Sequence, residues 1–102
     1  MKKAIAVRLR HGSRWIPGLP VRKQAYWDEH ARFMDALFDS GDVILAGPFA
    51  DDSGSMVILA AESVEAARAI FQDDPWAHQD ILLIDQVKEW TIFLDGRNKA
   101  QD

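Results

Sequence analysis

The chain has 102 residues, of which 48% are hydrophobic and 27% charged, and this length and composition predict a single globular domain. Its net charge of −4 argues against nucleic-acid binding, and the lack of cysteine excludes disulfides, thiolate metal sites and thiol nucleophiles. No apolar run approaches the roughly 20 residues that span a bilayer. The N-terminus lacks the apolar core of a signal peptide, so we expect a cytoplasmic protein without membrane contact.

The first half of the chain predicts a strand, a loop, a helix and a second strand. Residues 4–10 alternate in hydropathy with the period of two that is typical of a half-buried strand. Residues 11–20 contain two glycines and two prolines, which indicate a loop. We expect a helix over residues 21–39 that Gly41 ends, and then a strand over residues 43–49 that a proline interrupts.

The second half predicts a turn, a third strand, a second helix and a last strand. Residues 50–54 predict the turn, and residues 55–61 are rich in the branched apolar side chains that favour a strand. Ser63 is a suitable N-cap for a second helix. We expect that helix to close at Asp74, because the following proline disfavours helical geometry there.

The last predicted element is a long strand over residues 81–95, for which a bend or break near Asp85 is an open alternative. Residues 96–102 are polar, and we expect a tail there. The predicted domain therefore covers residues 1–95.

The order strand, helix, strand, strand, helix, strand is the split pattern of ferredoxin-like folds. We predict an α+β fold in which one antiparallel sheet carries both helices on one face. The strand over residues 55–61 is apolar on both faces, so the second face of the sheet also needs a cover. The economical cover is a second copy, and we predict a homodimer whose two sheets close into a dimeric α+β barrel.

His30 interrupts the apolar face of the first predicted helix, one turn after Tyr26 and one turn before Met34. Its ring should therefore point toward the sheet, where a semi-buried imidazole must satisfy both nitrogens. A carboxylate on one nitrogen would fix the tautomer and raise the basicity of the other, as in a general base. A core histidine that only holds the helix to the sheet is the alternative.

Two acidic loops of the predicted fold could supply that carboxylate. Asp74 precedes a proline and should therefore have an extended geometry at the end of the second helix. Asp52 lies in the predicted hairpin turn, where aspartates are common because they form turns. For Asp74, a helix-end or turn-capping role is the alternative to a role in catalysis.

Aromatic residues could form a cleft beside His30. Phe49 follows Gly47-Pro48, and Trp76 follows Asp74-Pro75. Trp15 and Trp27 could cover the opening of the cleft. Each tryptophan alone is more often packing than ligand contact, but an aromatic-lined cleft suits a ring-shaped or apolar small molecule. A backbone amide near Gly47 could hold a developing oxyanion.

Several other chemistries find no support in the sequence. The three histidines lack the spacing of metal ligands, so we expect no metal site. No glycine-rich phosphate loop is present, and turn, strand-start and cap positions explain the candidate serines without a nucleophilic triad. Proton transfer without a cofactor is the chemistry that remains.

Four features together resemble the YCII-related domain proteins, which are small bacterial proteins of the dimeric α+β barrel superfamily. The resemblance extends over roughly residues 3–95, and its features are AGPFADDSGSMVI, His30, ESVEAARAIFQDDPW and the closing Val87-x-x-Trp90. It implies a ferredoxin-like subunit, a dimer and a cleft with a His–Asp pair. Because the family motif is Asp-Pro-aromatic, the resemblance favours Asp74 over Asp52 as the partner of His30.

The resemblance also implies a kind of reaction. One related branch is a dehydrochlorinase of a chlorinated hydroxyhydroquinone, and muconolactone isomerases share the architecture. We therefore expect a cofactor-independent lyase or isomerase in which His30 moves a proton and Asp74 or Asp52 orients it. A non-catalytic module that binds a small ligand is one alternative, and a cofactor-free oxygenase, an activity found in the same superfamily, is another.

Overall fold

A computed structural model of the chain describes residues 1–97. Four strands form one antiparallel sheet in the order β2-β3-β1-β4, and the helices follow the βαββαβ order of a ferredoxin-like fold, so the predicted α+β class is confirmed. The strands are β1 (Lys3–His11), β2 (Val43–Pro48), β3 (Ser55–Ala61) and β4 (Leu82–Glu89). The helices are the 3₁₀ turn η1 (Val21–Lys23), α1 (Trp27–Asp39), α2 (Val64–Gln72) and α3 (Pro75–His78).

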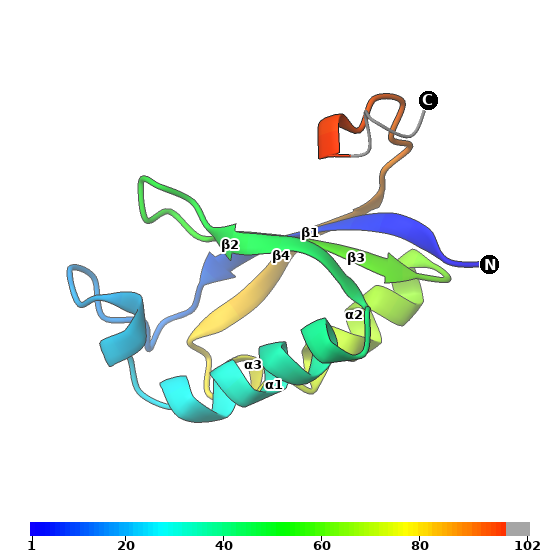
Figure 1. Ribbon diagram of the computed structural model, residues 1–102. Helices are drawn as coiled ribbons and strands as arrows, with labels where there is room; N and C mark the ends of the chain where they lie inside the picture. The colour runs from blue at the N-terminus through cyan, green and yellow to red at the C-terminus, as the bar shows by residue number, and fades with distance from the viewer. Residues whose placement is uncertain (98–102) are drawn as a thin grey trace.

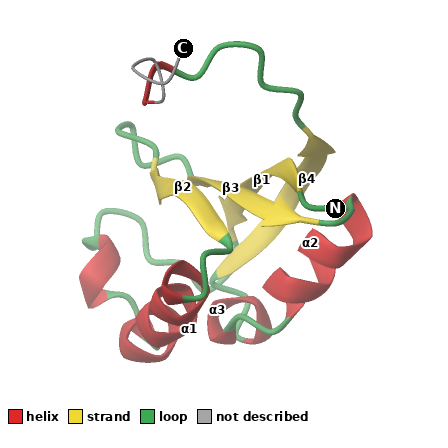
Figure 2. Ribbon diagram, turned by 45° about the vertical axis from the view of Figure 1, so that its right-hand side comes forward, coloured by secondary structure: helices red, strands yellow, loops and turns green. Residues whose placement is uncertain are grey.

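The molecule has two layers, a twisted sheet and a helical layer on one of its faces. Figures 1 and 2 show α1, α2 and α3 below the sheet, whereas the chain after β4 rises on the opposite side. The helix-free face therefore has no second layer in the described subunit. This arrangement agrees with the prediction that both helices pack on one face.

The core lies between the sheet and the helices. Ile5, Val7 and Leu9 of β1 alternate toward the helices and are buried, as the period of two predicts. In the register of the sheet, Val7 lies opposite Val57 of β3 and also opposite Val87 of β4. Phe71, Trp76 and Ile81 fill the space below these strands, so the inward faces of the two central strands β1 and β3 are almost completely buried.

The first long helix begins at Trp27, six residues later than the predicted start at residue 21. Tyr26 has a φ of 60° and thus a left-handed conformation, which separates α1 from the 3₁₀ turn η1. The buried side chain of Gln24 accepts a hydrogen bond from the Ile16 amide and donates to the Ile16 and Leu19 carbonyls. These tertiary bonds replace helical ones, so residues 21–26 do not continue the helix.

The second half of the fold differs from the prediction at Asp74. The predicted N-cap of α2 is confirmed, because the Ser63 hydroxyl accepts a hydrogen bond from the Ala66 amide at 3.0 Å. However, α2 ends at Gln72, and Asp74 begins the additional helix α3 rather than closing the second one. Proline is favoured at the first position of a helix, which explains why Pro75 starts α3.

The last strand is shorter than predicted, because β4 ends at Glu89 and not at residue 95. Its pairing with β1 contains a bulge: Arg8 lies opposite Gln86 and Leu9 opposite Ile84, which leaves Asp85 as the extra residue. This irregularity is the bend near Asp85 that the sequence left open. The division into a domain over residues 1–95 and a tail over 96–102 stays a prediction, since residues 98–102 lie outside the described part.

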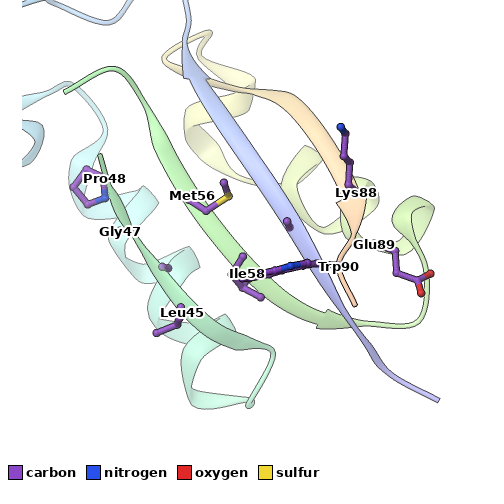
Figure 3. Close-up of a pocket in the computed structure, with 10 residues that line it drawn as sticks. Leu45, Gly47, Pro48, Met56, Ile58, Lys88, Glu89 and Trp90 are labelled. Atoms are coloured by element: carbon purple, nitrogen blue, oxygen red, sulfur yellow. The ribbon is translucent and has the colours of Figure 1, made fainter. Parts of the chain in front are cut away.

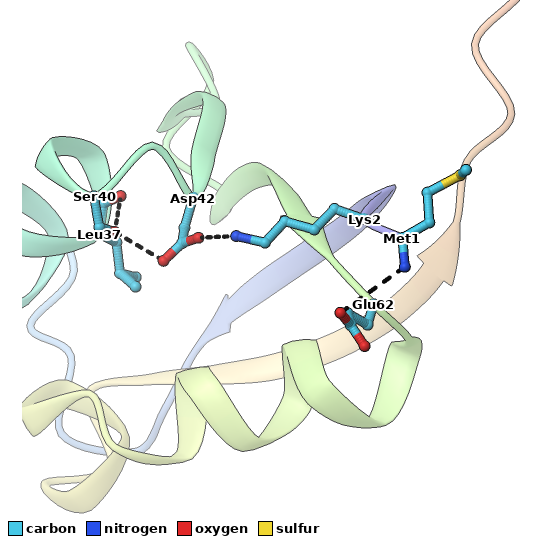
Figure 4. A network of polar contacts seen from close by, with 6 residues as sticks. All are labelled: Met1, Lys2, Leu37, Ser40, Asp42 and Glu62. Carbon is cyan, nitrogen blue, oxygen red and sulfur yellow. Dashed lines mark hydrogen bonds and ion pairs between the residues drawn. The ribbon is translucent and has the colours of Figure 1, made fainter.

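A small polar network ties the end of α1 to the start of β1 (Figure 4). Asp42 accepts hydrogen bonds from the Ser40 hydroxyl at 2.8 Å and from the Lys2 ammonium at 3.0 Å. These two contacts, that of Ser40 first, lower the pKa of the Asp42 carboxyl below its usual value. The folded state therefore favours the ionised form of Asp42 more than the unfolded state does.

We predict that Asp42→Asn lowers the melting temperature slightly at neutral pH. Because the folded pKa is lowered, the stabilisation by Asp42 is present above the unfolded pKa and is lost as the pH falls through the folded pKa. Thermal melts from neutral to acidic pH should thus show a difference from wild type that shrinks on acidification. Asp39→Asn is the matched control, and an Asp42→Asn defect independent of pH would contradict the assignment.

Candidate active site

The fold brings His30 of α1 next to Asp74 at the start of α3. The Nδ1 atom of His30 lies 2.9 Å from both carboxylate oxygens of Asp74. The two side chains are only 10% and 3% exposed, so this polar contact is almost completely enclosed. A charge-assisted hydrogen bond in such a place is stronger than one at the surface.

The Asp74 carboxylate is held by the backbone of its own helix. Its Oδ1 atom accepts a hydrogen bond from the Trp76 amide at 2.9 Å, which makes Asp74 the N-cap of α3. The predicted extended geometry is present, with φ of −64° and ψ of 127°. Capping and contact with His30 therefore occur together, and the helix-capping role proposed as the alternative for Asp74 does not exclude the pair.

This contact determines which ring nitrogen of His30 carries the proton. An ionised carboxylate has only acceptors, so Nδ1 of the neutral imidazole must be the donor toward Asp74. The Nε2 atom then has a free lone pair. Within residues 1–97 the Nε2 atom has no hydrogen-bond partner. It is not fully buried, whereas the unpaired Trp15 Nε1 is.

Aromatic rings fix the plane of the imidazole. The Trp76 ring stacks on the His30 ring with 3.9 Å between centroids and 7° between planes. The Trp27 ring is tilted by 50° to the His30 ring, with 5.8 Å between centroids. Trp76 is itself anchored, because its indole nitrogen donates to the Ala25 carbonyl at 2.7 Å. If His30 takes up a proton, the face of Trp76 and the Asp74 carboxylate both stabilise the resulting cation.

The ring of His30 borders a cavity of about 290 Å³ between α1, η1 and the sheet. For comparison, a cavity of about 150 Å³ holds benzene, so this space accommodates one substituted ring. The lining is largely apolar, and its polar side chains are Arg22, His30 and Ser55. The other lining residues are Leu9, Val21, Trp27, Met34, Ala46, Gly47, Pro48, Val57, Trp76 and Leu82.

A larger hollow of about 590 Å³ lies on the helix-free face of the sheet, as Figure 3 shows. Side chains from β2 and β3 form one side of it, and Lys88, Glu89 and Trp90 at the end of β4 form the other. Neither His30 nor Asp74 borders this hollow. We therefore place the candidate active site in the smaller cavity, where the paired imidazole is.

The structure does not bring every predicted site residue to that cavity. Gly47, Trp27 and Trp76 line it, but Trp76 is fully packed behind His30 rather than at an opening. Asp52 lies in the exposed turn between β2 and β3 with φ of 62°, and it makes no contact with His30 within the described residues. Phe49 belongs to the same turn and is not among the residues that line the cavity.

Trp15 lies behind the site and does not cover it. It packs edge-on against Trp76 with 5.8 Å between ring centroids, and it stacks on His11 at 3.9 Å. Trp15 is buried and does not line the cavity beside His30. Its packing supports the position of Trp76, so the long loop over residues 11–20 contributes to the site indirectly.

Sequence reasoning missed Arg22 and Gln24. Arg22 lines the cavity from η1, whereas Gln24 anchors that turn by its three hydrogen bonds. The prediction placed both residues inside a helix. One available signal was the pair Arg22 and Lys23 at the predicted helix start, because cations are unfavourable near a helix N-terminus.

Two further findings concern metals and membranes. The part of the chain that the structure describes has no group of three or more histidine, aspartate or glutamate side chains that could hold a metal ion. The same part contains no helix with the length and hydropathy needed to cross a bilayer. The expectation that the protein uses no metal stays a prediction.

Comparison with known proteins gives a family and a fold. The model of the YCII-related domain matches residues 7–91. A solved structure of 5-chloro-2-hydroxyhydroquinone dehydrochlorinase from Burkholderia phenoliruptrix AC1100, in complex with 2,5-dihydroxybenzoquinone, is similar with a TM-score of 0.58 and 22% sequence identity. The similarity covers 85% of this chain and 93% of that chain, and it shows a shared fold. No curated protein sequence matches the chain.

We predict that neutral His30 has its proton on Nδ1, because Asp74 offers only acceptors to that atom. Nitrogen-15 NMR of the imidazole should show a pyrrole-type Nδ1 and a pyridine-type Nε2. The exposed His78 serves as an internal control and should show a mixture of tautomers, since no side-chain hydrogen bond selects one. A His30 ring with its proton mainly on Nε2 would contradict this geometry.

Proposed function

The chain belongs to the YCII-related domain family, and we propose that it is a small-molecule enzyme of the proton-transfer type. His30 is the general base and acid, and Asp74 is the residue that positions it. The reaction is a lyase or isomerase reaction on a molecule with one ring. The proposal places the chemistry in the cavity of about 290 Å³ that His30 borders.

One observation carries this proposal: Nδ1 of His30 is fixed by a buried carboxylate at 2.9 Å while the ring borders a cavity large enough for a ligand. A histidine that only holds a helix in place would have no need of an adjacent ligand-sized space. The lone pair of Nε2 has no partner within residues 1–97, so it is available to a proton of a bound molecule.

The proposed steps follow from these contacts. Nε2 takes a proton from a bound substrate, and the resulting imidazolium is stabilised by Asp74 and the face of Trp76. In a lyase reaction, the electron pair left by the proton forms a new double bond and expels a leaving group with its own electron pair. In an isomerase reaction, His30 returns the proton to another atom of the same molecule.

The similar solved structure supports the lyase reading. That protein is a dehydrochlorinase in complex with a dihydroxybenzoquinone, which is a single-ring molecule. Loss of hydrogen chloride requires a base for the proton and a site that accommodates the chlorinated ring. The cavity beside His30 has both of these features, which favours chlorinated hydroquinones as the first compounds to test.

We predict that His30→Gln lowers the rate of proton transfer by about 10²–10⁴-fold, the usual contribution of a general base. Chloride release from 5-chloro-2-hydroxyhydroquinone and deuterium incorporation from heavy water into a panel of acidic single-ring compounds measure this rate. His78→Gln is the matched control, because His78 is exposed in α3 and outside the cavity.

Equal rates in wild type and His30→Gln would overturn the assignment of His30 as the base. A protein that binds single-ring compounds in this cavity without moving a proton on any of them would instead be a ligand-binding module. Oxygen consumption with an electron-rich phenol would indicate an oxygenase. Proton transfer, ligand binding and oxygen consumption are separate measurements, so these three results are distinguishable.

We also propose that the protein is a homodimer that pairs its helix-free sheet faces. This face and the segment after β4 carry exposed large apolar side chains, with Leu45 52% exposed, Phe93 89% and Leu94 93%. Figure 2 shows the segment after β4 on the same side as the bare face of the sheet. An apolar surface of this kind is typical of an interface between subunits.

We predict that Leu45→Glu converts the dimer into a monomer, because it places a charge on the apolar helix-free face. Sedimentation equilibrium should show the dissociation constant rising by about 100-fold or more, as expected when a charge disrupts a hot-spot contact of the interface. Phe38→Glu is the control, since Phe38 is 67% exposed but belongs to α1 in the helical layer. A wild-type protein that is monomeric at high concentration would contradict the proposal.

A further inference from the structure

Arg22 is the one cation among the side chains that line the cavity beside His30, and no carboxylate lines that cavity in the described part of the chain. Asp74 contacts Nδ1 of His30 and is not among the residues that line the cavity. The cavity thus offers a bound molecule one positive side chain, one imidazole nitrogen and one hydroxyl. The chain as a whole has a net charge of −4, so this local charge is opposite in sign to the protein.

Arg22 has no competing partner. Within residues 1–97 its guanidinium makes no hydrogen bond or ion pair, although it also borders a neighbouring outer hollow together with Asp35. A guanidinium presents a planar fork of donors that matches a carboxylate or another oxyanion. Its donors are therefore free for a ligand.

The backbone around Arg22 is fixed by tertiary contacts. The next residue but one, Gln24, is buried and makes three hydrogen bonds to Ile16 and Leu19. The Lys23 amide also donates to the Pro20 carbonyl at 2.9 Å. The turn that carries Arg22 is consequently part of the folded structure, which lowers the entropic cost of presenting the side chain to a ligand.

We propose that Arg22 determines specificity by binding an anionic group of the substrate, and that the substrate is a single-ring organic oxyanion. This inference rests on the proposed function, because it assigns a role to Arg22 in the same cavity that His30 borders. The apolar walls contact the ring, Arg22 contacts the oxyanion, and Nε2 of His30 faces the proton that moves. A carboxylate and an ionised ring hydroxyl are both oxyanions of the kind that a guanidinium binds.

The test compares binding of 2,5-dihydroxybenzoate with that of its neutral amide, 2,5-dihydroxybenzamide, by NMR titration. We expect wild type to prefer the anion, and Arg22→Gln to weaken anion binding by roughly 10- to 100-fold while leaving the amide unchanged. Arg22→Lys should retain part of the preference. Lys23→Gln is the matched control, because it removes an equal charge from the same turn outside the cavity.

Titration with 2,5-dihydroxybenzoquinone, which is ionised at its ring hydroxyls, separates the two kinds of oxyanion. A stronger Arg22 effect on this compound would indicate an ionised hydroxyl, and a stronger effect on the benzoate a carboxylate. Equal binding of anion and amide, equal losses in Arg22→Gln and Lys23→Gln, or no binding of any probe would each overturn the inference.

These outcomes are independent of those for the proposed function. Binding preference is an equilibrium property, whereas the role of His30 is measured as a rate of proton transfer. Anion preference without proton transfer would refute the enzyme and keep Arg22 as an anion-binding residue. Proton transfer without anion preference would keep the enzyme and refute Arg22 as its specificity determinant.

Discussion

The contact between the His30 imidazole and the Asp74 carboxylate joins α1 and α3 beneath the sheet. Desolvating a carboxylate is costly unless hydrogen bonds replace water. Asp74 obtains them from Nδ1 of His30 and from the amide of Trp76, so α3 can begin in a buried position. His30 in turn obtains a fixed tautomer and a fixed plane. The start of α3 and the orientation of the imidazole at the cavity therefore depend on the same carboxylate.

Aromatic residues connect the His30–Asp74 pair to the loops around it. Trp76 stacks on His30, and its indole is bonded to Ala25 between η1 and α1. Trp15 packs edge-on against Trp76, which connects the loop after β1 to the same cluster. Trp15 and Trp76 thus act mainly as packing elements that hold the imidazole. This explains why Trp15 and Trp76 are buried instead of lying at an opening.

Much of this arrangement could be predicted from local sequence patterns, because strand alternation indicates the buried face of β1, and Phe33 and Met34 indicate the face of α1 that packs against the core. His30 was identifiable as the polar exception in that stripe, and Asp74 as the residue before Pro75. The start of α1 was not identifiable, because side-chain bonds of Gln24 to Ile16 and Leu19 replace helical bonds only after the loop has folded. The same tertiary contacts place Arg22 at the cavity, so its position could not follow from helical periodicity.

The two sides of the sheet are linked through the end of β2. Ala46, Gly47 and Pro48 line both the cavity beside His30 and the hollow on the helix-free face. A Cβ added at Gly47 would meet no atom within 4 Å, so the space beside this residue is open. A subunit that covers the helix-free face would therefore contact the strand that also forms the cavity wall. In the proposed dimer, assembly and ligand binding would share this strand, whereas the His30–Asp74 pair lies wholly within one chain.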